Sequence, residues 1–188
     1  MIICAGIPRC GTTLMFGALA GLSIGGTTPK DYEGDVTKTH SFRPGRFTEV
    51  TKAIFMFGDP VAAIVSTKKR RMTPGHFRNC GAADLDPETT DIFSQDVLNY
   101  EKMFDAWMRR QPFDLICVRY ETLHENAQVI ASFFDDRYLY LKPKQPRRTT
   151  TDDVSEEDLA TIRSTYEKLA RKVERAADVT IYRAATQA

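Results

Sequence analysis

The chain has 188 residues, of which 42% are hydrophobic and 27% charged, and its formal net charge is +1. This length and balance are typical of a single globular domain, here residues 1–188, with its own core, and they argue against a disordered chain. The near-zero net charge excludes a general attraction to nucleic acid. The basic run at residues 68–71 has no interleaved aromatic residues, so no nucleic-acid partner is expected.

Two further features indicate a protein of the cytoplasm. The four cysteines, Cys4, Cys10, Cys80 and Cys117, form no Cys-x-x-Cys pair, and two of them fall in apolar runs typical of reduced core residues. The longest apolar stretch, about residues 14–24, contains glycines and is too short to span a bilayer, and no basic segment precedes the opening apolar run. We therefore expect a soluble, cytoplasmic protein with no membrane partner.

The first half of the chain alternates between apolar, β-prone runs and segments with helical spacing. In chain order, we expect a strand over 2–5, a helix over 12–22, strands over 35–40 and 53–57, and a helix from residue 60 towards residue 71. Asp59 and Pro60 are typical of the start of this last helix. Residues 73–87 then form a loop long enough to be a lid or a binding segment.

The second half continues the alternation. We expect a helix within 88–110, a strand over 113–118, a helix over 125–134, a short strand over 138–141, a basic loop over 142–151 and a C-terminal helix over 155–176. In the first helix, one core-facing stripe at helical spacing consists of Phe93, Val97, Tyr100, Phe104 and Trp107. Ser155 and Asp158 resemble a capping box at the start of the last helix.

This alternation predicts an α/β fold of three layers, in which a central parallel β-sheet is flanked by helices. Right-handed crossovers bring the loops that follow the strands to one edge of such a sheet, where ligands bind. The loop after the first strand, 5-AGIPRCGTTL-14, has the Gly-x-x-x-x-Gly spacing of a phosphate-binding P-loop. We therefore expect the first loop to be a P-loop-like site for an anion.

This loop lacks the lysine of a Walker P-loop, because Thr12 occupies that position and Arg9 is the only cation. Backbone N–H groups and the positive end of the helix dipole still suffice to hold a phosphate-like group. Without the lysine, the loop is not tuned for ATP with magnesium. The alternative is a glycine-containing turn that binds nothing.

The loop resembles that of the sulfotransferases that use 3′-phosphoadenosine 5′-phosphosulfate (PAPS), whose pattern is Gly-x-Pro-[Lys/Arg]-Ser-Gly-Thr-Thr. Residues 6–13 match this pattern, with cysteine in place of the usual serine. The resemblance implies that the 5′-phosphosulfate is held by Arg9, Cys10, Gly11, Thr12 and Thr13. It also implies PAP as the product and no requirement for a metal.

The triplet 38-KTH-40 is the second match to this family, where the histidine is the base and the lysine contacts the sulfonate. An alcohol needs a base to become a good nucleophile, and imidazole, with a pKa near 6.5, is the usual choice. A cation stabilises the charge that builds on the bridging oxygen. Strand alternation places Lys38 and His40 on one face, so both are candidate catalytic residues. The alternative is a polar strand end that serves solubility.

The third match is 54-IFMFGDPVAAIVSTKKRR-71, similar to a strand, an Arg-[Asn/Asp]-Pro turn and a helix whose serine binds the 3′-phosphate. The resemblance assigns that role to Ser66, but Gly58 stands where the family has arginine, the natural partner of a phosphate. Lys69 and Arg70 share the helix face of Ser66 and are candidates to replace it, whereas Lys68 points away. The alternative is a solvated basic helix end.

The fourth match is 114-DLICVRYETL-123, which resembles a strand that ends in Arg-Tyr-Glu-Asp-Leu. Here Tyr120 and Glu121 are expected to support the fold rather than to react. The resemblance covers about residues 1–135. Beyond it, Arg147 and Arg148 of the basic loop are candidates, by position alone, to close over the nucleotide.

These motifs predict a sulfotransferase that moves a sulfonate from PAPS to a hydroxyl or amine of a small-molecule or glycan acceptor. The chain is short between the first loop and the KTH triplet, so a homodimer partner could complete the acceptor pocket. His76 and His124 have no cysteine or carboxylate at metal-site spacing, so no metal is expected. The alternatives are a P-loop kinase of small molecules and, favoured by Gly58, a catalytically silent protein that binds PAP or another nucleotide.

Overall fold

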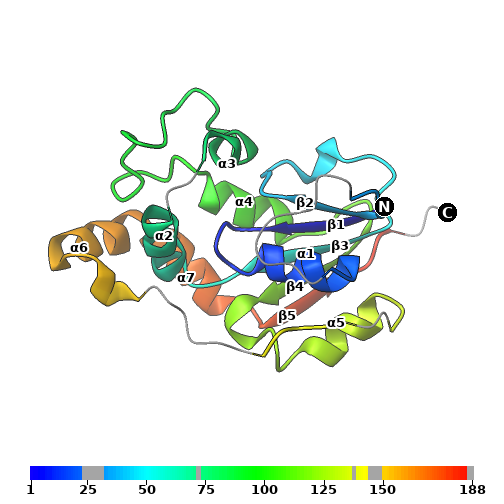
Figure 1. The fold of residues 1–188 in the computed structure, drawn as a ribbon. Helices are drawn as coiled ribbons and strands as arrows, with labels where there is room; N and C mark the ends of the chain where they lie inside the picture. Colours follow the sequence, from blue (N-terminus) through cyan, green and yellow to red (C-terminus); the bar gives the residue numbers. More distant parts are fainter. Residues whose placement is uncertain (23–31, 71–72, 137–138, 144–149, 186–188) are drawn as a thin grey trace.

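The computed structural model of the chain describes residues 1–22, 32–70, 73–136, 139–143 and 150–185. Within them, helices flank a five-stranded sheet of order β2-β1-β3-β4-β5, which makes the protein an α/β protein (Figure 1). The strands are β1 (Ile2–Gly6), β2 (Val36–Thr39), β3 (Lys52–Phe57), β4 (Asp114–Arg119) and β5 (Val179–Tyr182). The strands β1 to β4 are parallel, and β5 pairs antiparallel with β4.

Helices occupy the segments between and after these strands. The α-helices are α1 (Thr12–Ala20), α2 (Pro60–Lys69), α3 (Pro74–Asn79), α4 (Tyr100–Trp107), α5 (Ala127–Phe133), α6 (Glu156–Thr165) and α7 (Glu167–Arg175). The short 3₁₀ turns are η1 (Pro44–Arg46), η2 (Tyr120–Thr122) and η3 (Thr151–Asp153).

The hydrophobic core lies on both faces of the sheet. Along β3, Ala53, Phe55 and Phe57 face one side. Their neighbours Ile54 and Met56 face the other side, as the pleat of a strand requires. The first side is covered by α2, α4, α6 and α7, and the second by α1 and α5. Burial on both faces explains why the central strands are continuous apolar runs rather than alternating ones.

The prediction of a parallel sheet is confirmed for β1 to β4 and wrong for β5, which makes the sheet mixed. This strand has only four residues, and most of it is partly exposed, so it lacks the buried apolar run that marked the other strands. Contacts across the chain hold it beside β4. Arg119 N–H donates to the carbonyl of Asp178 at 2.8 Å, and the Asp114 carboxylate accepts from Ala184 N–H at 2.9 Å.

Two predicted helices are shorter than expected. The stripe within 88–110 is helical only from Tyr100, because the Asp96 carboxylate accepts the N–H groups of Tyr100 and Glu101 and starts the helix there. The predicted C-terminal helix over 155–176 begins after Ser155, whose hydroxyl accepts from Asp158 N–H, but divides at Tyr166 into α6 and α7. The stripe itself is buried apart from Val97, which is half-buried.

Two other segments differ from the sequence-based expectations. The loop predicted over 73–87 contains the helix α3, since Phe77 and Cys80 are buried and hold a helical turn against the core. In the segment predicted as a short strand over 138–141, residue 138 lies outside the described residues, and residues 139–141 are not a strand.

Candidate functional site

The loop between β1 and α1 has a tightly specified backbone. Ile7 N–H donates to the Met56 carbonyl at 2.9 Å, which ties the loop to β3, and Cys10 N–H donates to the Ile7 carbonyl at 3.1 Å. Arg9, the third residue of this turn, has a φ of 69°, the sign that a type II turn requires at that position. A residue other than glycine in this left-handed backbone conformation costs about 1–3 kcal/mol of stability. The contacts around the loop therefore hold Arg9 in this conformation.

Gly11 is required in this loop for two reasons. Its φ is 79°, and a Cβ atom at this position would lie 2.4 Å from the Tyr120 ring. The aromatic ring that follows β4 therefore packs directly against the loop. Helix α1 starts at the next residue, and its first N–H groups have no acceptor within the helix. Thr12 to Met15 carry no carboxylate, so this positive helix end suits an anion.

The side chains of Cys10 and Thr12 face the interior. Cys10 is fully buried in the core, so its thiol does not line the loop surface. Thr12 is 2% exposed. Its Oγ1 atom packs against Gly6, since a Cβ atom added to this glycine would lie only 2.4 Å from it. Among the residues that the structure describes, the Thr12 Oγ1 atom has no hydrogen-bond partner. Of these two predicted residues, only Thr12 carries an unused polar atom.

Arg9 and Ser66 are brought together from the loop and from α2. The Arg9 Nε–H group donates to Ser66 Oγ at 3.1 Å, across 57 positions of the chain. Partial burial lowers the pKa of Arg9, and the neighbouring positive charge of Arg70 lowers it further. A guanidinium and a hydroxyl thus meet here within range of a second positive charge, and an anion would stabilise this arrangement.

The other members of the basic run have different partners. Lys69 Nζ pairs with Asp153 of η3 at 2.5 Å. Lys68 Nζ lies 5.8 Å from the centre of the Phe93 ring, away from Ser66. Among the described members of this run, Arg70 is exposed and is the one whose positive charge acts on Arg9. Arg147 and Arg148 lie outside the described residues.

Lys38 and His40 lie at the carboxyl end of β2. Lys38 Nζ donates to Thr13 Oγ1 at 3.4 Å, and burial lowers the pKa of this lysine. His40 is 7% exposed, and its Nδ1 atom lies 2.6 Å from the Gly6 carbonyl oxygen. A carbonyl only accepts, so Nδ1 carries the proton and Nε2 is the basic atom. Burial lowers the pKa of His40 to about 4, so the imidazole is neutral at pH 7.

A second imidazole lies beside His40 that sequence reasoning did not assign to the site. The ring centres of His40 and His76 are 6.3 Å apart, and the Nδ1 atom of His76 lies 2.9 Å from Thr73 Oγ1. Partial removal from water lowers the pKa of His76, and the charges of Lys38 and Arg9 lower it further. The sequence signal that pointed to His76 was its place in the long segment 73–87, which was expected to be a lid or a binding segment.

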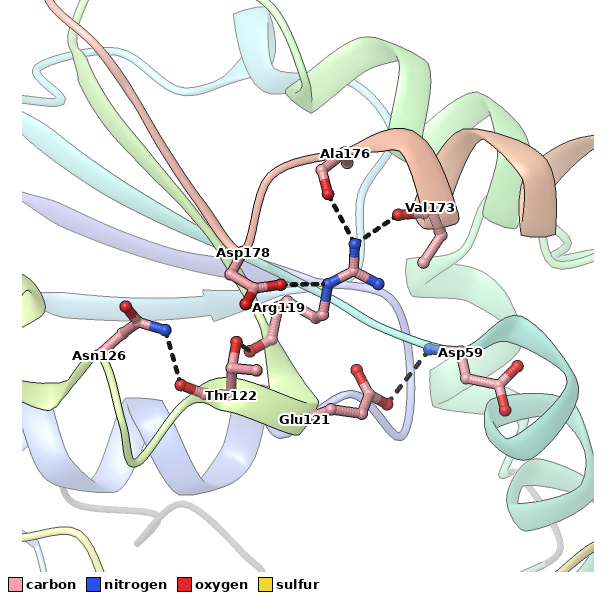
Figure 2. A network of polar contacts seen from close by, with 8 residues as sticks. All are labelled: Asp59, Arg119, Glu121, Thr122, Asn126, Val173, Ala176 and Asp178. Carbon is pink, nitrogen blue, oxygen red and sulfur yellow. Dashed lines mark hydrogen bonds and ion pairs between the residues drawn. The ribbon is translucent and has the colours of Figure 1, made fainter.

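The Glu121 carboxylate packs beside the glycine at position 58. A Cβ atom on Gly58 would lie 2.8 Å from Glu121 Oε2, and Glu121 Oε1 accepts from Asp59 N–H at 3.3 Å (Figure 2). Asp59 also caps α2, accepting from Val61 N–H at 2.9 Å. The carboxylate therefore takes the space next to the position where the sulfotransferase pattern has arginine.

Arg119 supports this corner from the end of β4. Its guanidinium donates to the carbonyls of Val173 and Ala176, at 2.6 and 2.7 Å, and to Asp178 Oδ1 at 2.8 Å (Figure 2). The ion pair leaves the Arg119 side chain only 18% exposed. These bonds join β4 to the end of α7 and to the turn before β5, so Arg119 has a structural role.

An open cleft of about 510 Å³ lies beside this corner, a volume sufficient for a small ligand. It is lined by Asp59, Pro60, Val61, Arg119, Glu121, Arg163, Glu167, Ala170, Arg171, Val173 and Glu174. No predicted site residue within the described ranges lines it. The predicted residues Arg9, Lys38, His40 and Ser66 lie instead around the first loop and form the candidate site for the predicted chemistry.

Comparisons with protein-family models and with curated protein sequences give no match to this chain. In the part of the chain that the structure describes, no helix has the length and apolar character needed to cross a membrane. The same residues contain no group of three or more His, Cys, Asp or Glu side chains that could hold a metal ion.

Proposed function

We propose that the protein is a PAPS-dependent sulfotransferase that transfers a sulfonate to a hydroxyl or amine of a small-molecule or glycan acceptor. The observation that carries the proposal is the bond between Arg9 and Ser66. In the sulfotransferases that the sequence resembles, these positions serve the 5′-phosphosulfate and the 3′-phosphate of one nucleotide. Their contact at 3.1 Å supports a single site for both groups.

The residues present fit such an anion. The α1 N-terminus carries no carboxylate in its first turn, and Arg9 and Arg70 are close enough to repel each other in the free protein. Bound PAPS would supply the sulfonate. The PAPS molecule would be held by Arg9, Arg70, Ser66, Thr13 and the N–H groups of the loop. A negative group bound at Arg9 would offset the repulsion between the two positive charges, which is a favourable contribution to binding.

The residues at the end of β2 would activate the acceptor and stabilise the leaving group. The neutral His40 imidazole is held by Gly6 so that Nε2 is its basic atom, and this atom would take the proton of an acceptor hydroxyl. Lys38, bonded to Thr13 at the start of α1, would stabilise the negative charge that develops on the leaving oxygen.

A catalytically silent protein that binds a nucleotide is the second candidate, and one observation favours it. The Glu121 carboxylate lies beside Gly58, where an arginine would otherwise neutralise the 3′-phosphate. A carboxylate at this place repels a phosphate, so discrimination for the 3′-phosphate depends on Ser66 and Arg70. A P-loop kinase is disfavoured because Thr12 replaces the Walker lysine.

The test is calorimetric binding of PAP and of its analogue without the 3′-phosphate, followed by transfer assays with labelled PAPS. We expect PAP to bind more tightly, and Ser66→Ala and Arg70→Ala to reduce this preference. Lys68→Ala is the matched control, because this lysine lies over Phe93 and should leave the preference unchanged. Equal affinity for both nucleotides would contradict the proposal, and PAP binding without transfer to any acceptor would favour the silent protein.

A further inference from the structure

The short helix α3 has a fixed position that follows from its buried residues. Phe77 is 2% exposed and Cys80 is fully buried, and the Cys80 carbonyl accepts from Asn99 Nδ2 at 2.8 Å. Thr73 begins the turn, and its carbonyl accepts from His76 N–H at 2.9 Å. Between these anchors His76 is exposed, so the helix holds an imidazole at the surface on a rigid support.

A second set of contacts places α3 against the segment that follows β2. Gly81 has a φ of 78°, and a Cβ atom there would lie 2.4 Å from the Phe42 ring. The Trp107 indole N–H donates to the Ser41 carbonyl at 2.8 Å, which fixes this segment to the core. Because both sides are held, the 6.3 Å separation of the His40 and His76 rings is a consequence of packing.

The two imidazoles differ in their access to water. His40 is buried, and its Nδ1 atom is engaged by the Gly6 carbonyl. His76 is exposed, and Thr73 Oγ1 orients its ring through Nδ1. The positive charges of Lys38 of β2 and Arg9 of the first loop act on His76. Both charges favour the neutral form of His76, which is able to accept a proton.

We propose that His76 is a relay residue through which the proton taken by His40 leaves the site. This inference rests on the proposed sulfotransferase function. As the acceptor oxygen bonds to sulfur and the bond from sulfur to the phosphate oxygen breaks, the acceptor proton passes to His40 Nε2. It then passes through one water to the neutral imidazole of His76, since the ring centres are 6.3 Å apart, and from there to solvent. Both imidazoles return to the neutral form, and no oxidation occurs.

The position of His76 beside His40, which the relay requires, has a consequence that can be measured without turnover. Burial is the larger cause of the lowered pKa of His76 and stays when an anion binds Arg9 and Lys38, but the part caused by these two charges is offset, so the pKa rises. PAP binding should therefore be accompanied by proton uptake at pH values below about 6.5, the ordinary pKa of an imidazole. Calorimetry in two buffers with different ionisation enthalpies measures this uptake directly.

We expect His76→Gln to reduce the proton uptake by at least half while the affinity for PAP changes less than threefold. His124→Gln is the matched control. His124 is the third histidine of the chain, and it does not belong to the pair of His40 and His76. Absence of PAP binding by the wild type would refute the proposed function and the relay with it. Normal PAP binding with unchanged uptake in His76→Gln would refute the relay alone.

Turnover gives a second test. His76→Gln should lower kcat about tenfold with an unchanged KM for PAPS, less than the loss on removing a general base. Millimolar imidazole should restore much of the rate to His76→Ala, because free imidazole can carry the proton, whereas a purely structural loss would not respond. Wild-type kcat in both variants would overturn the inference.

Discussion

Acidification should destabilise the folded protein through His40. Burial depresses the pKa of this histidine to about 4, compared with about 6.5 in an unfolded chain. The folded state therefore favours the neutral imidazole, and its stability is fully present above pH 6.5 and is lost as the pH falls towards 4. The difference of about 2.5 units corresponds to about 3.4 kcal/mol in full, of which about 2 kcal/mol is lost between pH 7 and pH 5.

Urea unfolding at pH 5, 6, 7 and 8 measures this loss by comparison with His40→Asn. The asparagine amide does not titrate, and it can donate a hydrogen bond to the Gly6 carbonyl as Nδ1 of His40 does. Other groups, such as Asp96 with its raised pKa, titrate in both proteins and cancel in the difference. The wild type should lose about 2 kcal/mol relative to the variant between pH 7 and pH 5.

A difference in unfolding free energy that stays constant with pH would refute this reasoning, because it would mean that His40 titrates alike in both states. His124→Asn serves as the control and should not change the pH dependence by this amount. The same depressed pKa predicts that kcat/KM, which reports the free enzyme, begins to fall at a pH below about 6.5. The sequence alone, with an unperturbed imidazole, predicts a fall near pH 6.5.

The remaining predictions concern the loop, its supports and the role of metal. Arg9→Ala should weaken PAP binding by about 1.5–3 kcal/mol, the value of a charge-assisted hydrogen bond, and unchanged affinity by calorimetry would remove Arg9 from the site. Gly11→Ala should destabilise the fold more than Gly21→Ala, since both have positive φ but only Gly11 faces an aromatic ring; equal midpoints in urea would contradict the steric argument. Arg119→Met should cost about 2–3 kcal/mol of stability, because two carbonyls lose a charged donor, again measured by urea unfolding. Chelation of magnesium should leave PAP binding and turnover unchanged, and a strict requirement for the ion would support a kinase.

Much of the fold was predictable because its signals are local. The apolar runs of β1 to β4 mark buried strands, and Asp59 and Ser155 cap the helices that they precede. These features depend on neighbouring residues and on the periodicity of the backbone. The antiparallel β5 and the break at Tyr166 depend instead on distant contacts, such as Arg119 with Asp178 and the Tyr166 hydroxyl with the Ile92 carbonyl.

The candidate site shows the same division. The sequence by itself determined the strand–loop–helix unit around Arg9 and the polar end of β2, because glycine spacing and strand alternation are properties of short segments. Only the tertiary structure decided that Arg9 meets Ser66, that Glu121 fills the space beside Gly58, and that His76 lies next to His40. The physical reason is that such contacts join residues far apart in the chain, and burial and packing, rather than local preference, select which of them form.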